Sequence, residues 1–205
     1  MDGGGLTNEY LDNLCSTILK KFDGVYSCDT FSKNVRKIKE GQKFICNLSH
    51  SLHPGSHFIA IVKKRGQLIY FDSFGLECYD KNIIQVLIRS CTVYTYSKTT
   101  IQDYMKSDFC GFYCAAFLCF IESEKSLASF LSHFDSRNLL ENDLKSVQLI
   151  EQFITAKHVR WSVITPSPYL TIFQKKYDNK QTYLPLEKTS KEKLWIYALQ
   201  KVNGA

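Results

Sequence analysis

The segment CGFYCAAFLCFI, residues 110–121, constrains the fold more than any other part of this sequence, because it contains almost no polar side chain. A helix over residues 111–122 would be apolar on every face, and such a helix has to be surrounded by other elements. The segment is too short to cross a bilayer, which requires about 20 apolar residues. We therefore expect a buried central helix in a soluble protein.

The size and composition of the chain fit one globular domain. Its 205 residues are 44% hydrophobic and 14% aromatic, which is enough to bury a sizeable core. We expect a single domain over residues 1–205, with residues 1–6 flexible. Eight cysteines would suit a secreted disulfide-linked protein, but the N-terminal sequence MDGGGLTNEYLDN has no basic or apolar region of a signal peptide. A reducing intracellular setting is the expectation.

Charge is moderately positive, with a net value of +6. This charge is compatible with an acidic partner, although it ordinarily reflects only charged side chains that are exposed to water. The basic clusters lie at residues 33–39, 63–65, 175–180 and 188–193.

Several short segments rich in β-branched and aromatic residues are predicted strands. Residues 43–48, 57–63 and 67–72 have this composition, and Arg65-Gly66 indicates a tight turn that joins the last two as a hairpin. Alternation of apolar and polar side chains predicts a further strand over residues 91–96.

Helical periodicity surrounds these strands. Apolar residues recur every three or four positions over residues 8–21, with Thr7 as the expected N-cap, and Asp80 caps a predicted helix that ends at residue 89. Further along the chain we expect helices over residues 126–157, an irregular segment over 162–187 and a last helix over 190–201.

The three cysteines of the central segment first suggest a metal site or a disulfide. Cys110, Cys114 and Cys119 lack the C-x2-C spacing of structural zinc sites, and no His-x3-5-His pair follows them, so we expect no metal. A disulfide within one helix would link nothing distant. Cys114 and Cys119 resemble small core residues.

Cys110 stands apart because it lies at the expected N-terminus of the central helix. Ser107 or Asp108 can cap this helix, and Gly111 leaves the next turn uncrowded. The partial positive charge of a helix N-terminus favours the thiolate form of a cysteine. Cys110 is therefore a candidate nucleophile, and a nucleophile of this kind requires a base.

The predicted hairpin supplies a base and a group to orient it. His57 opens one strand and Asp72 closes the other, so the turn brings them within a residue or two of register. The pair and Cys110 would form a Cys-His-Asp triad. The other histidines are weaker candidates: His50 and His53 lie in a predicted loop, and His133 and His158 are expected to be ordinary surface or helix residues.

Gln102 lies eight residues before Cys110, in the loop that leads to the helix. Its side-chain amide could join the Cys110 backbone N–H as a donor to an oxyanion.

The order His, Asp, Gln, Cys-Gly carries a family resemblance. With GSHFIAI at 55–61, YFDSFG at 70–75, CGFYCAAF at 110–117 and, more weakly, GVYSCDTF at 24–31, the chain resembles the adenain family, the maturation cysteine proteases of adenoviruses, polintons and virophages. More distantly it is similar to the peptidases that process ubiquitin-like proteins. The resemblance spans residues 8–122, about half of the chain.

This resemblance implies an α+β papain-like fold, in which a central helix carrying the nucleophile packs on a mostly antiparallel sheet, with additional C-terminal helices. It implies a viral endopeptidase that cleaves capsid or core precursor proteins at Gly-Gly type sites inside the virion and the infected cell. Cys110 would be the nucleophile, His57 the base, Asp72 the third member and Gln102 the oxyanion residue. We expect a monomer that does not bind membranes.

Activation is a further implication of the resemblance. The chemistry requires no cofactor, but Cys91 stands where the resemblance places a cysteine that bonds to an activating viral peptide, and DNA could raise activity. A buried structural cysteine is the alternative for Cys91. The opening residues MDGGG resemble a Gly-Gly cleavage site, which a flexible terminus or a cloning remnant explains equally well.

Two other functions stay open at this point. The chain could be a deubiquitinase or a peptidase of ubiquitin-like proteins, which also accepts Gly-Gly. It could also be a non-catalytic basic module that binds nucleic acid or the capsid interior.

Overall fold

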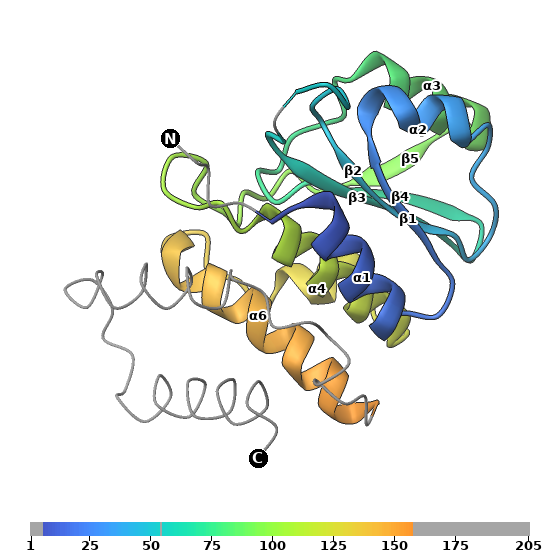
Figure 1. Cartoon of the computed structure of the whole chain (residues 1–205). Helices are drawn as coiled ribbons and strands as arrows, with labels where there is room; N and C mark the ends of the chain where they lie inside the picture. Colours follow the sequence, from blue (N-terminus) through green and yellow to red (C-terminus); the bar gives the residue numbers. More distant parts are fainter. Residues whose placement is uncertain (1–5, 54, 158–205) are drawn as a thin grey trace.

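A computed structural model describes residues 6–53 and 55–157 and shows an α+β fold (Figure 1). Within these residues one five-stranded sheet, in the order β1-β2-β3-β4-β5, has helices on both faces. The elements are α1 (Asn8–Ile18), β1 (Phe22–Ser27), α2 (Cys28–Asn34), β2 (Lys43–Asn47), β3 (Phe58–Lys64), β4 (Gln67–Phe71), α3 (Lys81–Ser90), β5 (Tyr94–Tyr96), α4 (Cys110–Glu122), α5 (Leu127–Leu131) and α6 (Leu139–Ala156).

The sheet is mixed rather than mostly antiparallel as we expected. β2, β3 and β4 pair antiparallel, but β1 pairs parallel to β2 and β5 pairs parallel to β4. Parallel neighbours need a crossover connection, and the segments between these strands contain α2 and α3 respectively. β1 and α2 were not predicted, and the first of these crossovers was therefore not expected.

The predicted hairpin is confirmed as β3 and β4. Lys64 pairs with Gln67, which leaves a two-residue turn. Arg65 and Gly66 both have positive φ, at 52° and 77°, as the turn that matches strand twist requires. The register continues to Ala60 opposite Phe71, so the residues just beyond the strands emerge at one end of the sheet.

The sheet separates two apolar cores. On one face α1, α4 and α5 lie against the sheet in a core with Ala60, Val62 and Phe71, and α6 packs on α4. On the other face α2 and α3 cover Ile59, Ile61 and Tyr70. Because β3 is buried on both faces, its sequence FIAIV is apolar without alternation.

The predicted central helix is confirmed as α4. All of its residues from Cys110 to Ile121 are buried except Phe112, because the sheet, α1 and α6 surround it. A methyl group added at Gly111 would lie 2.8 Å from side-chain carbons of both Leu6 and Leu11, so glycine permits the close approach of α1. Leu6 is buried at this contact.

The cap of α4 differs from our expectation. Phe109 is the N-cap residue, and its own side chain makes no capping hydrogen bond. Ser107 instead accepts a hydrogen bond from the backbone N–H of Phe109. Ser107 and Asp108 lie too early in the chain to cap a helix that begins at Cys110.

The other caps and helices follow the sequence pattern closely. Thr7 caps α1 by accepting from the N–H of Tyr10, and Asp80 caps α3 by accepting from two backbone N–H groups. The predicted helical region 126–157 contains α5 and α6. α1 ends at Ile18, three residues before the predicted end, because the chain turns at positive φ at Lys21 and enters β1.

The predicted strand over residues 91–96 is only partly present, and some other predictions concern residues that the structure does not describe. The strand predicted over residues 91–96 is shorter, because Cys91 ends α3 as its C-cap and β5 begins only at Tyr94. The irregular segment predicted over 162–187, the last helix over 190–201 and the expectations for MDGGG lie outside the described residues. None of the helices in the described ranges is both long and apolar enough to cross a membrane.

Phe130 on α5 joins the α4 core, and its replacement tests this packing. The ring is fully buried and meets Phe71, Phe117 and Phe120 at centroid distances of 5.4, 5.6 and 5.5 Å. We expect Phe130→Ala to lower the free energy of unfolding by about 3–5 kcal/mol, measured by urea denaturation. Leu52→Ala, at a side chain 92% exposed, should change it by less than about 0.5 kcal/mol. A loss below about 1 kcal/mol for Phe130→Ala would contradict this packing.

Candidate active site

The end of the β3–β4 hairpin brings His57 and Asp72 into direct contact. Asp72 follows β4 and His57 precedes β3, and extension of the register by one pair sets Asp72 opposite Ile59, two residues from His57. The Nε2 atom of His57 lies 2.8 Å from Oδ1 of Asp72. Both side chains are buried, with exposures of 7% and 1%. The structure therefore places this pair as the hairpin predicted.

Phe74 fixes the orientation of this pair. Its ring stacks on the His57 imidazole at a centroid distance of 4.0 Å and an interplanar angle of 11°. Its backbone N–H donates to the same Asp72 oxygen that meets His57, at 2.8 Å. Sequence reasoning missed Phe74, although its place two residues after Asp72 in the quoted segment YFDSFG was the available signal.

Cys110 reaches the same histidine from the start of α4. Both residues line the same groove, and Cys110 lies near enough to the imidazole to raise its pKa. Nδ1 of His57 is buried and makes no hydrogen bond within the described residues. Because Asp72 occupies Nε2, Nδ1 is the nitrogen left to exchange a proton with Cys110.

The surroundings of His57 favour its protonated form. Burial alone lowers the pKa of the imidazole, but the hydrogen bond to Asp72 and the neighbouring Asp72 and Cys110 side chains outweigh it and raise the pKa to about 9. The neighbouring side chains thus stabilise the charged form of the ring.

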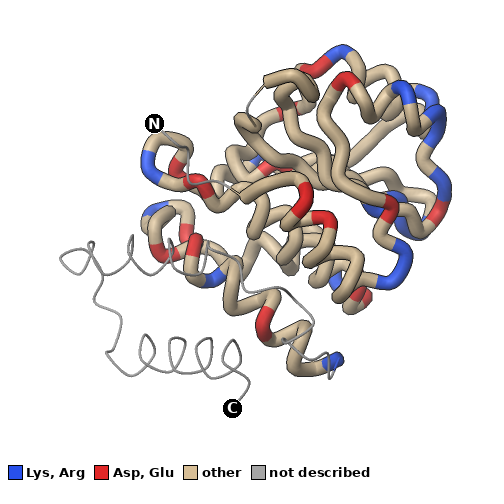
Figure 2. The backbone as a smooth tube through the Cα atoms, in the orientation of Figure 1, with Lys and Arg blue, Asp and Glu red and all other residues tan. Residues whose placement is uncertain are grey.

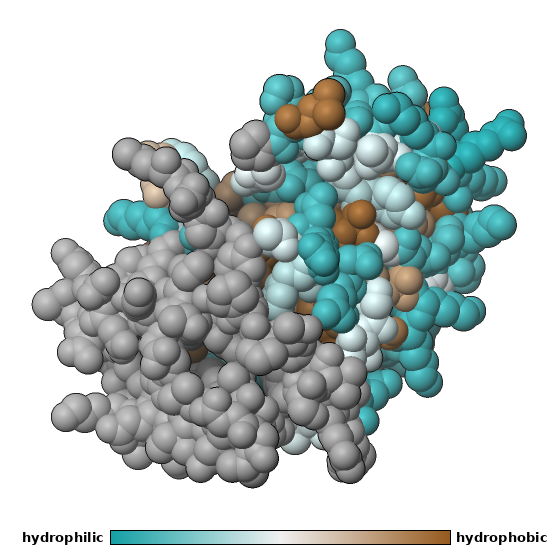
Figure 3. All heavy atoms as spheres, in the orientation of Figure 1, coloured by the Kyte–Doolittle hydropathy of each residue, from teal (hydrophilic) through white to brown (hydrophobic). Residues whose placement is uncertain are grey.

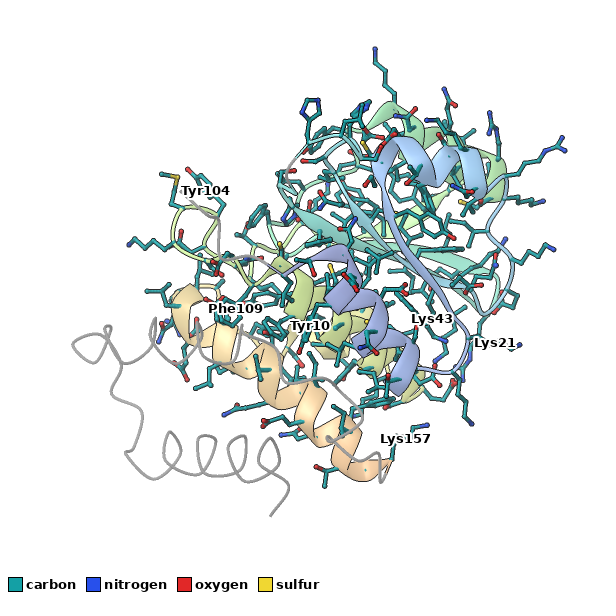
Figure 4. The ribbon with its side chains drawn as sticks, viewed as in Figure 1. Tyr10, Lys21, Lys43, Tyr104, Phe109 and Lys157 are labelled. Atoms are coloured by element: carbon teal, nitrogen blue, oxygen red, sulfur yellow. The ribbon has the colours of Figure 1, made fainter. Side chains whose placement is uncertain are left out.

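A groove of about 650 Å³ gives access to this cluster. His57 and Cys110 line it together with Phe74 and Tyr104, and much of the remaining wall is polar. Tyr104 projects from a loop beside the groove (Figure 4). The polar residues of the wall include Asn47, Ser49, His50, Ser51, His53 and Ser56.

Gln102 lies near this cluster but outside the residues that line the groove. Its side chain is fully buried, and its amide nitrogen donates to the backbone oxygen and the hydroxyl of Ser107, at 3.1 and 3.0 Å. Its carbonyl oxygen accepts from Ser73 at 2.6 Å. In this arrangement the amide holds the loop, and its role as an oxyanion donor stays a prediction.

The other cysteines have different surroundings. Burial raises the pKa of the Cys114 and Cys119 thiols well above the ordinary value, as suits core residues. Cys91 is half-buried, and burial also raises its pKa against an opposing effect of Lys63. All eight thiols are free, and in the described parts of the chain no three His, Cys, Asp or Glu side chains form a group that could hold a metal ion.

Comparisons with known proteins assign no family to the chain. No protein-family model matches it, and no curated protein is similar enough in sequence to count as a relative. The candidate site therefore stands on its own geometry.

The raised pKa of His57 predicts how stability depends on pH. Folding raises this pKa from 6.5 to about 9, so the stabilisation is fully present below about pH 6.5 and is lost as the pH rises through about 9. We expect Asp72→Asn to move the His57 titration, followed by NMR, to a lower pH. His57→Gln should lack this part of the pH-dependent loss in urea denaturation. A wild-type titration near pH 6.5 would contradict the arrangement.

Proposed function

We propose that the protein is a cysteine endopeptidase with Cys110 as the nucleophile. The observation that carries this proposal is the bond between Asp72 and His57 at a groove that His57 and Cys110 line together. A carboxylate, an imidazole and a thiol in this order are the parts of a Cys-His-Asp triad. The papain-like or adenain-like fold belongs to the same proposal and is supported by the helix α4 packed against the sheet.

In the proposed mechanism the imidazolium of His57 stabilises the thiolate of Cys110, which attacks the carbonyl carbon of the scissile peptide bond. The backbone N–H of Cys110 at the start of α4 donates to the resulting oxyanion, with Gln102 as the second candidate donor. His57 then protonates the leaving amine. Neutral His57 removes a proton from the water that attacks the thioester, the C–S bond breaks, and the carboxylic acid product leaves the Cys110 thiolate beside a protonated His57.

The proposed substrates are capsid or core precursor proteins of a virus, cleaved at Gly-containing sites in the virion or the infected cell. This part rests on the family resemblance of residues 8–122. A groove with a polar wall is compatible with an extended peptide held by main-chain hydrogen bonds.

Replacement of single cysteines tests the nucleophile. We expect Cys110→Ala to abolish cleavage while the fold is retained, and Cys114→Ala only to lower stability, because Cys114 is fully buried in α4. Cleavage is measured on intact precursor proteins, with ubiquitin-like conjugates offered in parallel to separate the two classes of peptidase. Wild-type turnover in Cys110→Ala would end the proposal.

A non-catalytic module is distinguished without any substrate. Stoichiometric reaction of iodoacetamide with Cys110 near neutral pH supports the enzyme, because an inert buried thiol reacts slowly.

Replacement of the other two residues tests the triad. His57→Ala should lower turnover more than Asp72→Asn, since the carboxylate orients an imidazole that transfers the protons. Wild-type turnover in both variants would contradict the proposed triad.

DNA stimulation has a defined candidate surface. Lys and Arg gather along the loop that follows α2, at an edge covered by hydrophilic side chains (Figures 2 and 3). A groove of about 1160 Å³ lies there, and Asp23 is the one acidic residue among those that line it. Its basic residues are Lys33, Arg36, Lys37, Lys39 and Arg89.

We expect DNA to raise activity and the effect to fade between about 50 and 200 mM salt, because neutralised phosphates release counterions. The double variant Arg36→Glu/Lys37→Glu should lose the effect.

A disulfide-linked activating peptide at Cys91 should raise activity independently of salt, and it should not activate Cys91→Ser. Full activity of the enzyme alone, unchanged by either addition, would show that it works without activators.

A further inference from the structure

A buried carboxylate on α6 connects to the loop that precedes Cys110. Asp143 is 2% exposed, and its Oδ1 atom accepts hydrogen bonds from the hydroxyls of Ser107 at 2.7 Å and Tyr113 at 3.1 Å. Ser107 lies three residues before Cys110, and Tyr113 lies in the first turn of α4. Phe109, the N-cap of α4, is labelled near the start of α6 in Figure 4.

The bonds continue from this carboxylate toward the His57–Asp72 pair. Ser107 accepts from the amide of Gln102, and Gln102 accepts from the hydroxyl of Ser73. The backbone oxygen of Ser73, next to Asp72, accepts from the N–H groups of Ile101 and Gln102 at 2.9 and 3.2 Å. One chain of hydrogen bonds therefore runs from Asp143 to the residue beside Asp72.

The neighbouring residue on α6 strengthens the same attachment. Asn142 is fully buried, and its amide donates to the backbone oxygens of Ile101 at 2.9 Å and Asp135 at 2.8 Å. α6 thus holds the loop at Ile101 through one side chain and at Ser107 through the next. The two attachment points flank the part of the loop that carries Tyr104.

We propose that Asp143 is a positioning residue that sets the place of Cys110 relative to His57. A charged acceptor makes stronger hydrogen bonds than a neutral one, and a buried network with its partners satisfied is rigid. A shift of about 1 Å between reacting groups can lower a rate on the order of 10²-fold. The proposal rests on the proposed function, because it assigns α6 a part in the same reaction.

The test uses the full-length protein with Asp143→Asn and Ser107→Ala. We expect each variant to fold and to lower kcat on a Gly-Gly-containing fluorogenic peptide by about tenfold, with KM changed less than about twofold. The rate of iodoacetamide labelling at Cys110, followed by mass spectrometry, should fall with kcat, and its pH profile should shift. The double variant should lose little more than either single variant, because both act through one connection.

Two controls separate positioning from loss of stability. Ser146→Ala removes a buried hydroxyl of α6 that donates to the backbone oxygen of Asp143 at 2.7 Å, so it should lower stability without changing kcat or labelling. Cys114, which is fully buried, reports unfolding and should stay unlabelled in every folded variant.

Wild-type kcat and Cys110 labelling in folded Ser107→Ala or Asp143→Asn would overturn the inference while the proposed function stands. An equal loss of kcat in Ser146→Ala would also overturn it. If Asp143→Asn does not fold, Ser107→Ala decides alone. A wild-type protein that neither cleaves nor becomes labelled at Cys110 would instead refute the proposed function.

Discussion

The burial of α4 on nearly every side is the constraint on which the rest of the structure depends. A helix with this composition is stable only when the sheet, α1 and α6 cover it, so those elements are arranged around it. The same burial fixes the position of its first residue, Cys110. The core that stabilises the fold therefore also holds the candidate nucleophile.

The site combines one local contact with several distant ones. His57 and Asp72 meet through the two-residue turn of the β3–β4 hairpin, whose register leaves little freedom. Cys110 meets them only because α4 packs on the face of the sheet formed by Ala60, Val62 and Phe71. The electrostatic state of His57 then follows from position, since Asp72 and Cys110 are the groups that raise its pKa.

Local signals made much of this predictable from the sequence. The Arg65-Gly66 turn gave the hairpin and so the His57–Asp72 pair, and the apolar segment 110–121 gave α4. β1 was missed because its residues Phe22–Ser27 are half-buried and contain a glycine, which weakens the strand pattern. The contacts of Asp143 could not be predicted, because hydrogen bonds between residues 30 and 36 positions apart leave no periodic signal in one sequence.

The long sequence separation of these last contacts has a consequence for biosynthesis. A ribosome delivers the hairpin with His57 and Asp72 long before α6, and local contacts form earlier than distant ones. The side of α4 that α6 covers stays exposed until residues 139–156 have left the exit tunnel. A nascent chain would thus form the His57–Asp72 pair early and complete the surroundings of Cys110 only late, so the synthesis of α6 is the last step in building the candidate site.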